Sequence, residues 1–135
     1  MERDPVICAG IGINSAVTAE ELSALLAEAP KRPKRIAVLR EKKSVAGFQR
    51  FASHCPVKLI ALDVAEIVGE QVLTYSERVY ARFGTGSVAE ALALAAARRH
   101  SETPAQVQLL GPRLISSGGR ATLALAATIP AETQT

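Results

Sequence analysis

Short apolar runs alternate along the chain with segments in which apolar residues recur every three or four positions. A short apolar run bounded by turn residues is typical of a buried strand, and the recurring spacing is that of an amphipathic helix. Strands are predicted at residues 5–9, 36–39, 57–62, 107–110 and 121–128. This alternation favours a single three-layer α/β/α domain over residues 1–135, with a mostly parallel or mixed sheet of about five strands and a frayed tail at 130–135.

Helix starts are marked by capping-box spacing, in which a Ser, Thr or Asp and a Glu three residues later each satisfy a backbone N–H group of the first turn. The pairs with this spacing are Thr18 with Glu21, Asp63 with Glu66, and Ser87 with Glu90. Further helices are predicted to begin at Ser44 and at about Ser76. The segment after Ser87 is the clearest helix, because its apolar residues share one face and its many alanines permit close packing on a sheet.

The block at 84–91 couples a glycine turn to this helix start. Glycines let the backbone approach a ligand closely, and the free N–H groups of a helix start lie at the positive end of the helix dipole. A phosphate or a carboxylate suits such a site, whereas the alternative is a well-capped helix without a ligand. The candidate ligand-binding residues of the block are Gly84, Thr85, Gly86, Ser87 and Glu90.

A second glycine turn is expected at Gly10 and Gly12, at the end of the first apolar run. Ligands of α/β domains bind beyond the carboxyl ends of the strands, so both turns are expected at that edge. A nucleotide is poorly supported, because Ser15 stands where a dinucleotide fingerprint has its third glycine and the chain has no phosphate-loop motif. No cofactor and no metal are expected, since His54 and Cys55 have no second pair at zinc spacing. The sequence offers no convincing combination of a nucleophile and a general base, so it does not indicate catalysis.

The composition is that of a globular protein, with 48% hydrophobic and 21% charged residues. Only 4% of the residues are aromatic and none is tryptophan, which disfavours nucleic-acid modules that stack bases on exposed rings. The amino end lacks the pattern of a secretory signal, and no apolar run has the length of a membrane span. We therefore expect a cytoplasmic protein in which Cys8 and Cys55 are reduced thiols.

The net charge of +3 is modest, but seven of the sixteen Lys and Arg residues lie within positions 31–43. These are Lys31, Arg32, Lys34, Arg35, Arg40, Lys42 and Lys43. Such a cluster can steer anionic partners toward the protein. The alternative is a solvated loop followed by strand ends.

Several segments together resemble the CobE family and the C-terminal domain of CbiG, which are proteins of cobalamin biosynthesis. The matching segments are 10–12, 18–22, 42–48, 73–76, 84–94 and 121–126. The most specific of them is Gly-x-Gly-Ser-Val-Ala-Glu-Ala at 84–91, and the resemblance runs over about 6–127. Arg113 stands where a lysine is common in the family, and it keeps a charge that can grip a carboxylate.

The resemblance implies a role on the pathway to the corrin ring, whose precursors are macrocycles fringed with acetate and propionate groups. The leading hypothesis is a protein that binds or hands on a polycarboxylated precorrin or corrin intermediate, held by Lys42, Arg113 and the backbone of 85–87. One alternative is a lactone hydrolase acting on a precorrin, because CbiG is associated with lactone opening and acetaldehyde release. Another is an interaction module that docks on other cobalamin-pathway enzymes or forms a homo-oligomer. Membranes and nucleic acids are not expected partners.

Overall fold

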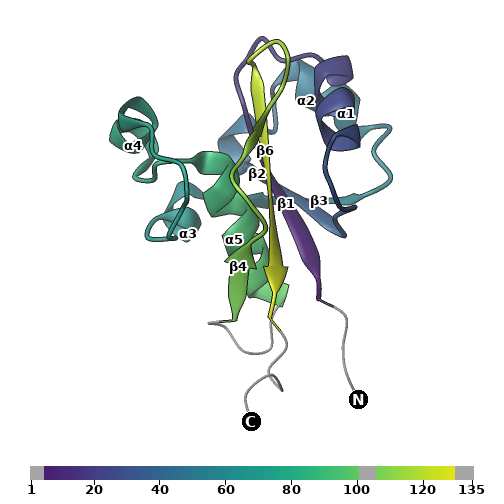
Figure 1. Cartoon of the computed structure of the whole chain (residues 1–135). Coiled ribbons are helices and arrows are strands. Elements are labelled where there is room, and N and C mark those ends of the chain that lie inside the picture. Colours follow the sequence, from purple (N-terminus) through teal and green to yellow (C-terminus); the bar gives the residue numbers. More distant parts are fainter. Residues whose placement is uncertain (1–4, 101–105, 130–135) are drawn as a thin grey trace.

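The structure, a computed structural model, describes residues 5–100 and 106–129 (Figure 1). The tail at 130–135, for which we expected fraying, lies outside the described residues. The strands are β1 (Ile7–Ile13), β2 (Arg35–Leu39), β3 (Lys58–Leu62), β4 (Val107–Leu109), β5 (Leu114–Ile115) and β6 (Ala121–Thr128). The helices are α1 (Ala19–Ala27), α2 (Ala46–Ala52), α3 (Val64–Ile67), α4 (Glu77–Phe83) and α5 (Val88–His100), with a 3₁₀ turn at Arg40–Lys42. Within the described part of the chain, no helix has the length and apolar content that crossing a membrane requires.

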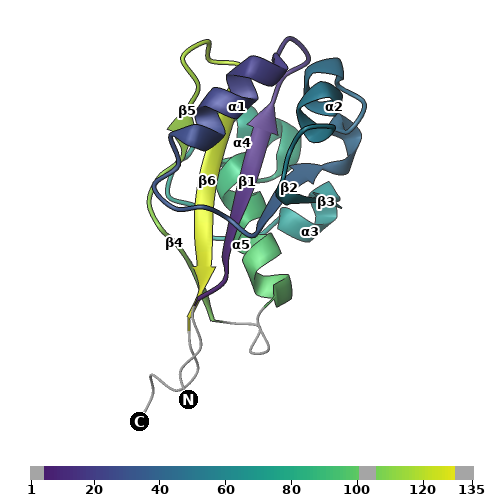
Figure 2. The same ribbon diagram turned by 90° about the vertical axis from the view of Figure 1, so that its right-hand side faces the viewer.

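The strands form one mixed sheet in the order β3-β2-β1-β6-β4, and β5 also pairs with β6. Strands β1, β2 and β3 run parallel, whereas β6 is antiparallel to β1, β4 and β5. In Figure 2, α1 crosses in front of β6 and β1, and α5 lies behind them. The predicted three-layer α/β/α domain with a mixed sheet is confirmed. The pattern did not predict β5, which has only two residues.

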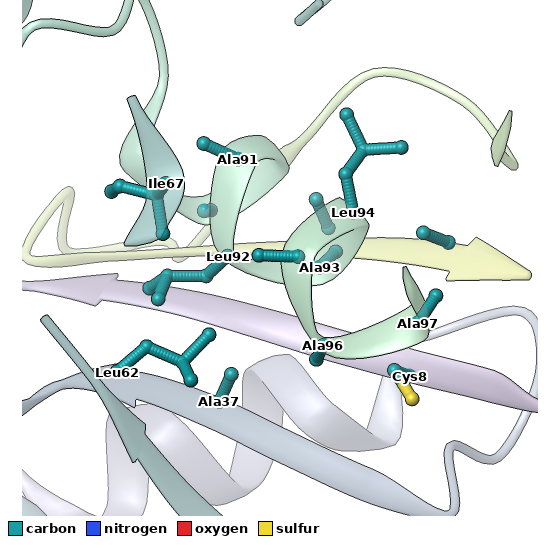
Figure 3. Packing of buried hydrophobic residues seen from close by; sticks show 14 of the residues in the cluster. Cys8, Ala37, Leu62, Ile67, Ala91, Leu92, Ala93, Leu94, Ala96 and Ala97 are labelled. Atoms are coloured by element: carbon teal, nitrogen blue, oxygen red, sulfur yellow. The ribbon is translucent and has the colours of Figure 1, made fainter. Parts of the chain in front are cut away.

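Two cores lie on the two faces of the sheet, because successive strand residues point to opposite sides. Along β1, Cys8 belongs to the core that α5 covers, and Ala9 and Ile11 belong to the core shared with α1 and α2. Figure 3 shows the first core, in which Leu92 and a series of short alanine side chains from α5 lie against the strands. Short side chains let this helix come close to the sheet.

Helix α5 comes very close to the sheet at Gly10. A Cβ atom on this residue would lie 2.2 Å from the carbonyl oxygen of Ala89 and 2.5 Å from the backbone nitrogen of Ala93. Strand β1 continues through Gly10 and Gly12 to Ile13, so the turn predicted at these glycines is wrong. The glycine inside the strand instead marks a place where another backbone packs closely.

Most predicted helix starts are found. Thr18, Asp63 and Ser76 are the N-cap residues of α1, α3 and α4. Helix α2 differs, since Val45 and not Ser44 is its N-cap and no side chain caps it. The 3₁₀ turn that ends at Lys42 occupies the segment just before it.

Candidate functional site

A cavity of about 500 Å³ lies at the carboxyl ends of β1 and β2, next to Val88, the first residue of α5. Part of its wall comes from α4, and another part comes from Arg113 and the segment 119–122 at the start of β6. The segment 11–14 at the end of β1 also lines it. This is the edge at which α/β domains usually bind their ligands.

Five basic side chains, and no Asp or Glu, are found among the described residues that line this cavity. The five are Lys42, Arg78, Arg82, Arg113 and Arg120. They come from three regions that are far apart in the sequence, around 42, 78–82 and 113–120, and their convergence in one concave site concentrates positive potential there. We call this site the cationic cavity.

Most of these cations form no ion pair with another described residue of the protein. Arg120 Nη1 lies 3.4 Å from Oε1 of Glu21, and the Arg82 guanidinium lies over the Phe83 ring, 5.0 Å from its centroid. Arg113 has a buried Nε atom without a hydrogen-bond partner. Of the five lining cations, four form neither a side-chain hydrogen bond nor an ion pair with the described part of the chain: Lys42, Arg78, Arg82 and Arg113. Their charges are therefore available to an anionic ligand.

Glu90 lies next to the cavity without lining it, and it is 0% exposed. Its Oε1 accepts hydrogen bonds from the backbone N–H groups of Leu73 and Thr74, at 2.7 and 2.9 Å. Its Oε2 accepts from the Thr74 hydroxyl at 2.7 Å and from the Arg113 N–H at 2.8 Å. Burial is the strongest influence on the pKa of Glu90 and raises it, but these hydrogen bonds together outweigh burial and hold the pKa below its ordinary value. The buried carboxylate is therefore ionised and fully satisfied.

A second glutamate, Glu21 of α1, holds the segment that leads into β6. Its Oε2 accepts hydrogen bonds from the Ser116 hydroxyl and from the Arg120 N–H, the latter at 3.1 Å. The bond from Ser116 above all, with those from Arg120, holds the pKa of Glu21 below its ordinary value against the opposing effect of burial. Glu21 thus positions the Arg120 end of the cavity wall.

Three of the sequence-predicted site residues line the cationic cavity: Gly12, Lys42 and Arg113. Gly10 lies under α5 instead. Ser87 caps α5, since its hydroxyl accepts from the Glu90 N–H at 3.3 Å. The Glu90 carboxylate does not reach back to Ser87, so only half of that predicted capping box forms.

The block 84–87 is covered by other parts of the protein. Gly84 ends α4 in a left-handed conformation with φ of 75°. Thr85 and Ser87 are buried, and the Ser87 N–H donates to the Thr85 hydroxyl oxygen at 3.4 Å. Gly86 lies so close to Tyr75 that a Cβ atom would come within 2.9 Å of its Cα. None of these residues is among those that line the cationic cavity.

Sequence reasoning missed three of the five cations, namely Arg78, Arg82 and Arg120. A signal for the first two was present, because residues four apart on a helix share one face. Arg120 follows a glycine turn, and nothing in its local sequence pattern points to a ligand site.

The basic cluster at 31–43 does not form one surface. Strand β2 separates 31–34 from 40–43, and a strand of this length spans roughly 17 Å. Lys31 and Arg32 line a different groove of about 740 Å³ between α1 and α2, whose walls are largely apolar and include an acid, Glu20. Although that groove is larger, it lies away from the carboxyl ends of the strands, and the cationic cavity is the better candidate.

Comparison with protein families connects this fold to known proteins. The family model described as "Cobalamin synthesis G C-terminus" matches residues 7–126, which is most of the chain. No functionally curated protein matches the sequence.

Two solved structures are similar over almost their whole length. One is CobE, described as a protein from the cobalamin (vitamin B12) biosynthetic pathway, which is 26% identical with a TM-score of 0.77, covering 96% of this chain and 95% of CobE. The other is the cobalamin biosynthesis protein chiG from Agrobacterium tumefaciens str. C58, which is 23% identical with a TM-score of 0.64, covering 91% of this chain and 98% of chiG. The second likeness shows a shared fold.

Proposed function

Because the chain belongs to the family of the cobalamin synthesis G C-terminus, we propose that it binds or hands on a polycarboxylated precorrin or corrin intermediate of cobalamin biosynthesis in the cationic cavity. The observation that carries this proposal is the set of five basic side chains around a cavity whose described lining contains no acid. The similar protein CobE is itself described as a protein of this pathway.

The chemistry of the two sides is complementary. Precorrins and corrins carry several carboxylates on flexible acetate and propionate arms around the ring. A guanidinium can bind a carboxylate through two parallel hydrogen bonds, and a lysine ammonium adds a mobile point charge. Cations spread over several segments can engage several arms at once, which a single anion-binding helix start cannot do.

The size of the cavity indicates how such a ligand would lie. A volume of about 500 Å³ is within the usual range for small-molecule sites, yet it is smaller than a whole tetrapyrrole with its arms. The carboxylate arms of one edge would therefore enter the cavity while the rest of the ring stays at its mouth. This arrangement suits a protein that receives a ligand and passes it on.

The proposal is tested by titrating the protein with hydrogenobyrinic acid while following the absorbance of the corrin. The control ligand is the same ring with its carboxylates converted to amides. We expect saturable binding of the acid that weakens as salt is added, since ion pairs are screened, and much weaker binding of the amide. Equal affinity for the acid and the amide would contradict the proposal. Acetaldehyde release from a lactone-bearing precorrin would instead favour the lactone hydrolase.

A matched pair of neighbouring lysines tests the place of binding. Lys42 lines the cavity, whereas Lys43 follows it in the chain and does not. Replacing Lys42 by Ala should weaken binding by about three- to tenfold, as expected for the loss of one ordinary hydrogen-bonded contact, and flatten the salt dependence. The Lys43→Ala change removes the same net charge and should have a much smaller effect. Equal losses in the two variants would show attraction to the whole surface and not to this site.

A further inference from the structure

One buried carboxylate joins two parts of the wall of the cationic cavity. Glu90 Oε1 binds the backbone at Leu73 and Thr74, just before α4, and Oε2 binds both the Thr74 hydroxyl and the backbone N–H of Arg113. Helix α4 carries Arg78 into the lining, and Arg113 lines the cavity itself. The two parts are thus tied to the same side chain on the first turn of α5.

Helix α4 has few other contacts that hold it in place: Phe83 at its end packs against the core that α5 covers, and the centroid of the Tyr80 ring lies 5.7 Å from that of the Tyr75 ring. None of its seven residues is buried, and Figure 1 shows it as the outermost element beside α3. Apart from its own capping, its start is fixed by a hydrogen bond from the Ser76 N–H to the Gly86 carbonyl at 3.0 Å and by the loop that Glu90 grips. A short helix in which no residue is fully buried depends strongly on such anchors for its position.

We infer that Glu90 is a positioning residue, which sets the distance between Arg113 and the arginines of α4 and thereby the spacing of ligand carboxylates that the cavity accepts. This inference rests on the proposed function. Glu90 touches no ligand in this scheme. It acts through its neighbours. The backbone N–H groups of Leu73, Thr74 and Arg113 and the Thr74 hydroxyl all donate hydrogen bonds to its carboxylate.

The change Glu90→Gln tests this role because it conserves shape and reverses one polar contact. Four donors converge on two carboxylate oxygens, and an amide offers only one oxygen, so its NH₂ group faces donors. At least one of the two segments should then be released. Loss of the negative charge would by itself strengthen the attraction of a polyanion, so weaker binding cannot come from charge alone.

The matched control is Glu70→Gln. Glu70 is also a largely buried glutamate, and its carboxylate binds Arg98 at 2.7 Å. Arg98 lies near the other end of α5, roughly 12 Å along the helix from Glu90. The control therefore makes the same change of charge and also removes a contact with α5, at a place away from the cationic cavity.

The experiment is a double-mutant comparison of hydrogenobyrinic acid binding. We expect Glu90→Gln to weaken binding by about tenfold, the lower end of the range for one charge-assisted contact, and Glu70→Gln to change it by less than about twofold. Glu90→Gln should weaken binding clearly less in an Arg113→Ala background than in a Lys42→Ala background. The reason is that, of these two cations, Glu90 holds only Arg113. A merely destabilising change would weaken binding by the same factor in both backgrounds, and that result would overturn the inference.

Amide hydrogen exchange provides a readout that needs no ligand. In Glu90→Gln, exchange should speed up at Leu73, Thr74 and Arg113, and remain slow in β1. If Glu90→Gln fails to fold, Thr74→Val removes one donor to Oε2 and should show the same pattern more weakly. If the wild type does not bind the corrin acid, the proposed function fails and the exchange result decides the positioning role. Unchanged exchange at Arg113 would overturn it.

Discussion

The close contact between β1 and α5 makes Gly10→Ala a sharp test of the fold. The added Cβ would lie 2.2 Å from the Ala89 carbonyl oxygen, 2.5 Å from the Ala93 nitrogen and 2.7 Å from the Leu92 Cβ. Unbonded heavy atoms need about 3.5 Å, so the backbone of α5 must move by about 1 Å or more. None of the three atoms is the end of a flexible side chain, and the strain cannot be relieved by a rotamer change.

The expected cost follows from this geometry. Overpacking of a core costs about 1–3 kcal/mol when side chains can adjust, so a clash with helix backbone should cost about 3 kcal/mol or more. For a domain of this size, that lowers the melting temperature by about 10 °C. Urea denaturation and thermal unfolding followed by circular dichroism would measure the loss.

Gly12→Ala is the matched control, two residues along the same strand. Its Cβ would meet the Thr122 Oγ1 at 2.8 Å, while the nearest atom of the α5 backbone, the Ala89 nitrogen, is 3.8 Å away. A side-chain hydroxyl can rotate, so the cost should be below about 1.5 kcal/mol. If Gly10→Ala were as stable as Gly12→Ala, the close packing of α5 on β1 would be refuted.

Two further predictions concern ionisable groups. Because the folded pKa of Glu90 lies below its unfolded value of 4.5, its carboxylate stabilises the fold above that value and the contribution is lost as the pH falls through the folded pKa. The difference in melting temperature between wild type and Glu90→Gln should therefore shrink in acid, and a constant difference would count against this. Burial raises the pKa of the Cys8 thiol to about 11, against a smaller opposing effect of Arg35. Because the thiolate is the reactive form, a thiol reagent at neutral pH should label the half-buried Cys55 before Cys8. Equal labelling of both thiols in the native protein would contradict the buried position of Cys8.

Most elements of this fold could be predicted from the sequence because they have a local signal. Apolar runs fix the strands, and the caps at Thr18, Asp63 and Ser76 are local hydrogen bonds that need no tertiary contact. The two-residue β5 carries no such signal, since it exists only through its pairing with β6. The prediction of a turn at Gly10 was wrong because a glycine next to an apolar run marks either a bend of the chain or a place where another backbone packs closely. Only the position of α5 distinguishes the two.

The cationic cavity could be predicted only in part for a related reason. Lys42 and Arg113 were expected to hold carboxylates, but the sequence does not show that Arg120 lies beside them. That proximity depends on β6 running antiparallel to β1, which places the start of one strand beside the end of the other. The basic cluster at 31–43 is close together in the sequence but not in space. Strand β2 places 31–34 and 40–43 at opposite ends of the sheet.

The block 84–91 gains a different meaning once the structure is considered. In sequence it has the form of an anion site, with glycines before a capped helix, yet Gly86 is the residue that lets the chain at Tyr75 pass close by, and Glu90 grips that same chain and Arg113. Gly86 and Glu90 of the motif therefore help to fix the segments next to α4 and Arg113, while the cations themselves lie on segments with less distinctive sequences. If the cavity binds a ring of carboxylates, its selectivity should depend as much on this buried scaffold as on the arginines that touch the ligand, and changes in the motif should alter which ligands bind before they abolish the fold.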